Sequence, residues 1–377
     1  MSNIWKEVER LGQSLWYDNL SRAVISDGTI ARMIGELGLR GITSNPSIFE
    51  KSISNGDEYD DSIEQAVRDG LTTGEIYERL TTDDVRSAAD VMRPVFERTQ
   101  GVDGYVSIEV DAKLAKKTEE TIQAARKLWK IVDRPNVMIK IPGTPEGVPA
   151  IRQCLTEGIN INITLLFGIE SYTDVAHAYL NALRERRKRG EDVSRMASVA
   201  SFFLSRVDTN VDHKLEAKIG AADGTAHHLR PLLGKAANAN AKLAYERYLE
   251  IFHGQEFAGL QAAGAHPQRC LWASVSTKNP KYSDVMYIEP LIGAETVTTV
   301  PDETIEAFAD HGKAADTLAM GTREAHETIE QLLKHGIDTE QVAVELQVEG
   351  VKKFMDAFDS LAKNLDKKRH TMEAVIS

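Results

Sequence analysis

A lysine inside an apolar segment is the first feature of this sequence that suggests chemistry. Lys140 lies in the run Val-Met-Ile-Lys-Ile at residues 137–141, which Pro142-Gly143 closes. Such a run is typical of a buried strand and its turn. Burial disfavours an ammonium ion relative to the neutral amine, and a neutral lysine amine is a nucleophile that forms Schiff bases with carbonyl compounds. The alternative is a lysine whose ammonium reaches water past the strand end.

Other polar residues stand near the carboxyl ends of predicted strands. Asp18 ends the run 14–18, and Glu109 lies near the end of the run 105–110. Each has an ordinary explanation, as a turn residue or a solvated charge, so the interpretation rests on their joint placement. Side chains two apart on a strand share a face, which puts Asn162 and Thr164 together. The other polar residues at such ends are Thr43, Ser44, Asn45, Asp111, Ser201, Arg206, Ser274, Ser276 and Lys278.

The spacing of apolar runs predicts the fold class. Eight strand-like runs alternate with helical patterns, which implies a parallel sheet with right-handed crossovers. No dinucleotide glycine fingerprint or P-loop supports an open sheet. We therefore expect an α/β protein with a (β/α)8 TIM barrel, in which catalytic groups occupy the carboxyl ends of the strands. The predicted strands are 14–18, 41–43, 105–110, 137–141, 159–165, 197–203, 270–275 and 296–300.

Two helical regions exceed a minimal barrel. Residues 57–100 have helical periodicity and predict helices inserted after the second strand. Residues 302–377 are helical in pattern and should pack on the outside of the barrel. No linker-like stretch divides the chain, so we expect residues 1–377 to form a single domain.

Composition limits the classes of partner and location. The 377 residues include 57 acidic and 45 basic side chains, a net charge of −12, which argues against non-specific nucleic-acid binding. Anionic substrates would need local positive groups. No apolar run could span a membrane, and the N-terminus lacks a secretory signal pattern. Cys154 and Cys270 lie far apart in apolar contexts, as expected of a reduced cytoplasmic protein. The sequence is compatible with a homo-oligomer.

Six segments of the sequence resemble the transaldolase family. The resemblance is most specific in three motifs, Thr-x-Asn-Pro at 43–46, Ser-x-Glu-Val at 107–110 and Lys-Ile-Pro at 140–142. It runs in order from about residue 14 to about residue 310, and the run 271–280 is most similar to the longer bacterial branch. The segments are 16–22, 41–47, 106–111, 138–144, 161–167 and 200–208.

The resemblance implies a reaction and roles for single residues. A transaldolase moves a dihydroxyacetone unit from a ketose phosphate to an aldose phosphate in the pentose phosphate pathway. By resemblance, Lys140 forms the Schiff base, and Asp18 takes and returns the proton of the hydroxyl at the cleaved bond. Glu109 is the acid and base of the imine steps, acting through a water held by Thr164. Substrate-binding or pocket-shaping positions would be Thr43, Asn45, Asn162, Ser201, Phe203 and Arg206.

The chemistry of these residue types agrees with that assignment. Cleaving a carbon–carbon bond needs an electron sink, which a protonated imine supplies. Two carboxylates in separate roles then serve the alcohol and the imine water. The imine takes the place of a Lewis acid, and the histidines show no ligand spacing beside strand ends, so we expect neither a metal nor a cofactor.

The sequence departs from the family pattern at the seventh strand. Better-known relatives end this strand in Ala-Ser-Phe-Arg, whose arginine binds phosphate. Here Ala273-Ser274 is followed by Val-Ser-Thr and Lys278. Ser276 takes the arginine's place in an ungapped alignment, whereas Lys278 takes it if the loop is two residues longer. We favour Lys278, because a phosphate dianion needs more than Arg206.

Two other functions compete with transfer. A Schiff-base aldolase of the same superfamily would release free dihydroxyacetone, but such aldolases typically carry Gln and Tyr where Glu109 and Phe203 stand. A non-catalytic barrel could serve as a scaffold. The presence of Lys140, Asp18 and Glu109 together argues against that function.

Overall fold

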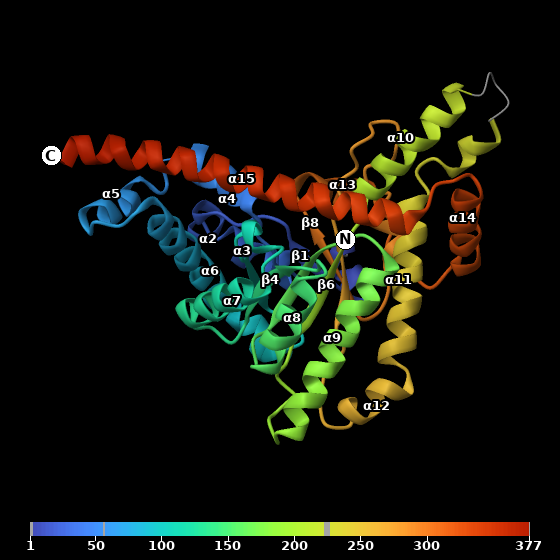
Figure 1. Cartoon of the computed structure of the whole chain (residues 1–377), viewed down its shortest axis with the longest axis horizontal. Helices are drawn as coiled ribbons and strands as arrows, with labels where there is room; N and C mark the ends of the chain where they lie inside the picture. The colour runs from blue at the N-terminus through green and yellow to red at the C-terminus, as the bar shows by residue number, and fades with distance from the viewer. Residues whose placement is uncertain (1–2, 56, 222–226, 377) are drawn as a thin grey trace.

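The computed structural model describes residues 3–55, 57–221 and 227–376. Eight parallel strands form a closed barrel in which each strand pairs with the next and β8 pairs with β1 (Figure 1). This confirms the predicted (β/α)8 barrel. The strands are β1 (Gln13–Tyr17), β2 (Gly41–Ile42), β3 (Tyr105–Glu109), β4 (Val137–Pro142), β5 (Ile161–Leu166), β6 (Ser198–Phe203), β7 (Arg269–Ala273) and β8 (Thr296–Val300).

The strands are apolar because the barrel buries both of their faces. Every residue of the eight strands is buried, as expected where helices cover the outside and side chains fill the interior. The strand register then places the few polar residues of these strands next to one another. Glu109 of β3 pairs with Lys140 of β4, and Lys140 pairs with Asn162 of β5. Three polar residues from neighbouring strands therefore share one level of the barrel.

Helices surround the barrel and extend it at the two regions predicted from the sequence. Helices α5 and α6 fall within the predicted insertion 57–100, α4 lies before it, and α13, α14 and α15 follow β8. None of the helices in the described part of the chain is long and apolar enough to cross a membrane. The helices are α1 (Ile4–Arg10), α2 (Arg22–Ser26), α3 (Thr29–Glu36), α4 (Pro46–Asn55), α5 (Asp60–Arg68), α6 (Thr73–Arg98), η1 (Ala112–Leu114), α7 (Thr118–Val132), α8 (Gly147–Thr156), α9 (Ile169–Lys188), α10 (Ser205–Ala221), η2 (His227–Leu232), α11 (Ala236–Phe252), α12 (Gln255–Gln261), η3 (Glu289–Leu291), α13 (Asp302–His311), α14 (Thr322–Lys334) and α15 (Thr339–Ile376).

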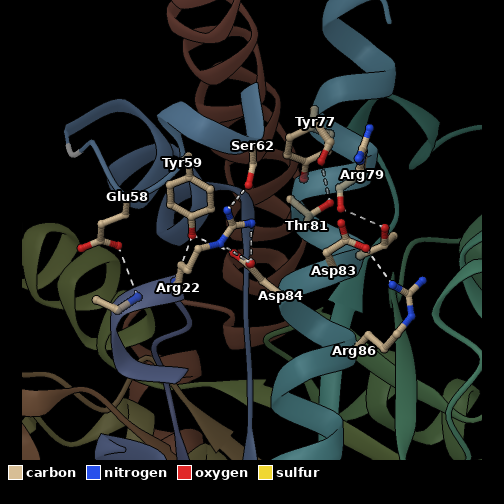
Figure 2. A network of polar contacts seen from close by, with 12 residues as sticks. Arg22, Glu58, Tyr59, Ser62, Tyr77, Arg79, Thr81, Asp83, Asp84 and Arg86 are labelled. Atoms are coloured by element: carbon tan, nitrogen blue, oxygen red, sulfur yellow. Dashed lines mark hydrogen bonds and ion pairs between the residues drawn. The ribbon is translucent and has the colours of Figure 1, made fainter. Parts of the chain in front are cut away.

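A partly buried polar cluster ties the inserted helices to the segment that follows β1 (Figure 2). The guanidinium of Arg22 pairs with Asp84 of α6 at 3.0 Å and donates to the hydroxyl of Ser62 of α5 at 2.6 Å. It also stacks over the ring of Tyr59, whose hydroxyl donates to Asp84 at 2.7 Å. Burial raises the pKa of Asp84, and Arg22 opposes that shift. The cluster therefore fixes the chain four residues beyond Asp18.

The longest helix, α15, lies across the carboxyl ends of the strands. It spans 38 residues and contacts α4, α5, α6 and α10 as well as β5 (Figure 1). Gln347 of α15 donates to the carbonyls of Gly143, just after β4, and Leu165, in β5. The other two C-terminal helices lie elsewhere, since α13 contacts α1 and α14 contacts α11. The end of the barrel that should carry the site is thus partly covered by the last helix of the chain.

Candidate active site

A cavity of about 230 Å³ opens at the carboxyl end of the barrel. It brings together most of the residues that the sequence predicted for the site, although they come from five strands or the segments that follow them. Residues from α15 and from the segment after β8 complete its wall. The predicted residues that line it are Asp18, Thr43, Asn45, Lys140, Ser201, Phe203, Arg206 and Lys278.

Lys140 is buried and faces a carboxylate. Its Nζ lies 3.5 Å from Oε2 of Glu109 and donates to the carbonyl of Ser44 at 3.1 Å. The side chains of Lys140 and Glu109 are 6% and 3% exposed. Burial raises the pKa of Glu109 to about 7, although Lys140 opposes that shift. A carboxyl group that titrates near neutral pH beside an amine is suited to proton transfer in both directions.

The oxygens of Glu109 are otherwise free. Both are buried without a hydrogen-bond partner among the described residues, and the same is true of the hydroxyl of Thr164. Thr164 of β5 is paired with Pro142 of β4, and Pro142 lies two residues after Lys140 on the same strand. Buried polar atoms that lack a protein partner usually contact water or a ligand. Glu109 and Thr164 are therefore the groups to which a catalytic water could bind.

Asp18 lines the same cavity as Lys140. Its Oδ1 accepts a hydrogen bond from Thr43 at 2.9 Å, and the hydroxyl of Thr43 lies 2.6 Å from that of Thr299. Because the single hydroxyl proton of Thr43 goes to Asp18, Thr299 must donate to Thr43. Burial raises the pKa of Asp18, and Lys140 and Thr43 oppose the shift. A desolvated carboxylate with an ordered partner on one oxygen is suited to act as a base through the other.

Asn162 connects three strands inside the barrel. The hydroxyl of Ser201 donates to its Oδ1 at 2.7 Å, and its Nδ2 donates to Ser107 at 3.0 Å. These bonds fix the amide orientation. Asn162, Glu109 and Thr164 are buried and do not line this cavity, whereas Glu109 lines a separate cavity between β3, α6, α7 and α15.

Two positively charged side chains, those of Arg206 and Lys278, also line the cavity. Arg206, at the start of α10, lies over the ring of Phe203 at 5.6 Å, and its Nη1 is buried with no hydrogen-bond partner in the described part of the chain. Lys278 and Ser276 both line the cavity, and Nζ of Lys278 donates to Ser276 at 3.3 Å. Both residues that the sequence offered for a second phosphate contact therefore lie at the cavity.

Helix α10 also anchors the loop that carries Lys278. The hydroxyl of Tyr282 donates to Asp212 at 2.6 Å, and that of Tyr287 donates to Asp208 at 2.9 Å. Arg206 begins the helix that holds these carboxylates. Helix α10 thus carries Arg206 and also anchors the loop that carries Lys278, so it links the positions of the two cations.

The sequence matches a known protein family over most of its length. A family model described as Transaldolase/Fructose-6-phosphate aldolase matches residues 15–365. The chain belongs to this family. The matched range includes all eleven predicted site residues and most of α15.

Similar transaldolases span nearly the same length as this chain. A protein named Transaldolase from Trichodesmium erythraeum is 47% identical over 372 residues, 98% of both chains. Transaldolase 2 from Nostoc sp. is 48% identical over 96% of both chains. A Transaldolase from Thiobacillus denitrificans is 48% identical over 95% of this chain and 98% of its own length.

The transaldolase-type site contains residues that sequence reasoning did not select. Glu303 follows β8, lines the cavity and accepts from Ser276 at 3.3 Å. Phe354 of α15 forms part of the wall, and Thr299 of β8 supports Thr43. A polar residue in the eighth strand was visible in the sequence, but Phe354 is one of many apolar positions on a long helix. In the described residues, no three His, Cys, Asp or Glu side chains gather in a way that could hold a metal ion.

Proposed function

We propose that this protein is a transaldolase that acts through a Schiff base on Lys140. It transfers a dihydroxyacetone unit from sedoheptulose 7-phosphate or fructose 6-phosphate to glyceraldehyde 3-phosphate or erythrose 4-phosphate, in the pentose phosphate pathway. The observation that carries this proposal is the buried pairing of Lys140 with Glu109, together with Asp18 on the same cavity. Family membership and the full-length transaldolase relatives support the same reaction.

Imine formation uses Lys140 and Glu109. Nζ of Lys140 attacks the ketone carbon of the donor after Glu109 has taken a proton from the ammonium group. The resulting carbinolamine loses its hydroxyl as water, with the proton supplied by Glu109, and an iminium ion remains. A water between Glu109 and the hydroxyl of Thr164 relays these protons, which accounts for their buried atoms without protein partners.

Bond cleavage uses Asp18. Its carboxylate takes the proton of the hydroxyl next to the bond that breaks, and the bonding electrons move into the iminium to form an enamine. The aldose phosphate leaves, and an acceptor aldehyde takes its place. Reversal of the same steps joins the three-carbon unit to the acceptor, and hydrolysis of the imine restores Lys140.

The remaining site residues would bind the substrate. Asn45 and Asn162 hold hydroxyls of the three-carbon unit, Thr43 and Phe203 shape the pocket, and Ser201 and Arg206 form the phosphate end of the site. Arg206 and Lys278 supply the charge that the phosphate needs, which matters because the protein as a whole is acidic.

A coupled assay separates transfer from simple aldol cleavage. Fructose 6-phosphate with erythrose 4-phosphate should give glyceraldehyde 3-phosphate continuously, whereas fructose 6-phosphate alone should give little more than one equivalent per site. Continuous release of dihydroxyacetone without an acceptor would instead make the protein an aldolase. Glu109 and Phe203, where the aldolases resembling this family typically have Gln and Tyr, favour transfer.

The wider setting is part of the same proposal. We infer a cytoplasmic protein, in which the buried thiols of Cys154 and Cys270 stay reduced, that binds sugar phosphates and not nucleic acid. A homo-oligomer is compatible with this function. We also propose that residues 1–377 form one domain, because α15 contacts both the inserted helices and β5.

A further inference from the structure

One face of α15 contacts a single segment of the barrel at successive turns of the helix. Its contacts recur at a spacing of three or four, as expected for one face of a helix. Four of them meet residues 165–169, where β5 ends and α9 begins, and the fifth lines the catalytic cavity. The five positions are Glu340, Ala343, Gln347, Gly350 and Phe354.

Two of these contacts are hydrogen bonds to main-chain groups. Oε1 of Glu340 accepts from the backbone nitrogen of Ile169 at 2.7 Å, which satisfies a donor at the N-terminus of α9. The amide nitrogen of Gln347 donates to the carbonyl of Leu165 at 3.2 Å and to that of Gly143 at 2.9 Å. Gln347 therefore links the ends of the two strands that carry Thr164 and Lys140.

Gly350 allows the helix to come this close. A Cβ on Gly350 would lie 2.8 Å from Cδ2 of Leu165 and 3.6 Å from Nη1 of Arg206. The first distance is shorter than side-chain contacts allow, so Leu165 would have to move. Glycine is unfavourable in the interior of a helix, and close packing against Leu165 explains its presence here.

The segment under α15 has an unusual backbone. Leu165 has φ of +59°, in the left-handed region that branched residues rarely adopt, and the register of β5 against β6 shifts between Ile163 and Leu166. Such bulges redirect neighbouring side chains and recur beside active sites. The neighbours here are Thr164, whose hydroxyl has no protein partner in the described chain, and Phe167, which packs on Phe203 at 5.2 Å.

We propose that α15 is a positioning element of the active site, and that Gln347 holds the β5 bulge in the conformation that presents Thr164 to the catalytic water. The inference rests on the proposed function, because the role of Thr164 is defined by imine formation. Without Gln347, the carbonyls of Leu165 and Gly143 would lose the hydrogen bonds that its amide donates, and the left-handed conformation of Leu165 would lose a side-chain restraint. The C-terminal helix then serves catalysis in addition to covering the barrel.

The test compares Gln347→Leu with Gln341→Leu, which removes the same amide from the exposed side of the same helix. The rate of imine formation is measured by quenching single-turnover mixtures of enzyme and fructose 6-phosphate into borohydride. Gln347→Leu should slow trapping about tenfold, the effect of losing one or two hydrogen bonds. KM for phosphorylated substrates should stay within about twofold, because Arg206 and Lys278 keep their places. Gln341→Leu should match the wild type.

Amide hydrogen exchange gives a second readout that does not depend on activity. Residues 165–168 should exchange faster in Gln347→Leu than in Gln341→Leu, while the rest of the barrel exchanges alike in both. Equal trapping rates, or equal exchange at these residues, would overturn the inference. If the wild-type enzyme traps no adduct at all, the proposed function fails, and the exchange comparison still decides whether Gln347 restrains the bulge.

Gly350→Ala is the alternative variant should Gln347→Leu fail to fold. It keeps the hydrogen bonds of Gln347 and displaces Leu165, so imine formation should again slow. A wild-type trapping rate in Gly350→Ala would show that the conformation of Leu165 does not control Thr164 and would overturn the inference.

Discussion

Nζ of Lys140 lies 3.5 Å from Oε2 of Glu109, and both groups are buried in the barrel. Their strands are neighbours, and the two residues are paired in the β3–β4 register. Asp18 lines the same cavity as Lys140 but comes from β1. Glu109 is therefore placed to exchange protons with the nitrogen of Lys140, and Asp18 to take a proton from the substrate hydroxyl. Neutralising each carboxylate should block a different step of the reaction.

Neutralising the two carboxylates should stop the reaction at different stages. Glu109→Gln cannot exchange protons with Lys140, so borohydride should trap an adduct late and slowly. Asp18→Asn should form the imine but not cleave it, so the trapped species should keep the mass of the whole ketose. Mass spectrometry of quenched single-turnover samples distinguishes them. If both variants accumulate the same species at the same rate, the two roles are wrongly divided.

Imine formation should depend on pH near neutrality. Burial raises the pKa of Glu109 to about 7, and only the ionised carboxylate can accept a proton from Lys140. The trapping rate should therefore fall about tenfold per unit as pH drops below about 7, and it should level off above that value. Measuring it in Asp18→Asn removes the titration of Asp18 from the profile.

The control for this pH profile is the double variant with Glu109→Gln added. It has no carboxyl group at this position, so the inflection near pH 7 should vanish. An unchanged acidic limb would assign the titration to another group.

The second phosphate contact can be assigned by substitution in the loop after β7. Lys278→Ala should raise KM for phosphorylated substrates by about ten- to a hundredfold, because a lost charge-assisted hydrogen bond costs about 1.5–3 kcal/mol. Dihydroxyacetone, which lacks the anion, should be nearly unaffected as a donor. Arg206→Ala should be at least as severe, since Nη1 of Arg206 is buried with no partner in the described residues.

Ser276→Ala is the matched control in the same loop. It removes the hydroxyl that contacts Lys278 but leaves the cation, so its effect on KM should be much smaller. If Lys278→Ala leaves KM unchanged, the cation lies elsewhere and the alignment that places Ser276 at this position is the better one.

The barrel and its central residues could be predicted because their signals are local. Lys140 interrupts an apolar run, and Glu109 lies at the end of another, so each was visible within a few residues of sequence. Alternation along a strand then gave the face on which each side chain lies. Once eight such runs imply a barrel, their carboxyl ends must meet, and the cavity brings Asp18 and Lys140 together as expected.

The contribution of α15 could not be predicted in this way. Periodicity shows which face of a helix is apolar, but it does not show which part of the molecule that face covers. Gln347 donates hydrogen bonds to main-chain carbonyls more than 180 residues earlier in the chain. Every residue has such a carbonyl, so the pattern of side chains does not identify these partners. The carbonyl of Ser44, which accepts from Lys140, was hidden for the same reason.

Identifying the residue that carries the substrate tests the account most directly. The enzyme is incubated with fructose 6-phosphate, reduced with borohydride and digested, and the modified peptide is located by mass spectrometry. We predict a reduced three-carbon adduct on Lys140, and none in Lys140→Ala, which should keep the wild-type circular dichroism spectrum. An adduct on another lysine, such as Lys130 or Lys278, or the absence of any adduct in the wild type, would contradict the central claim.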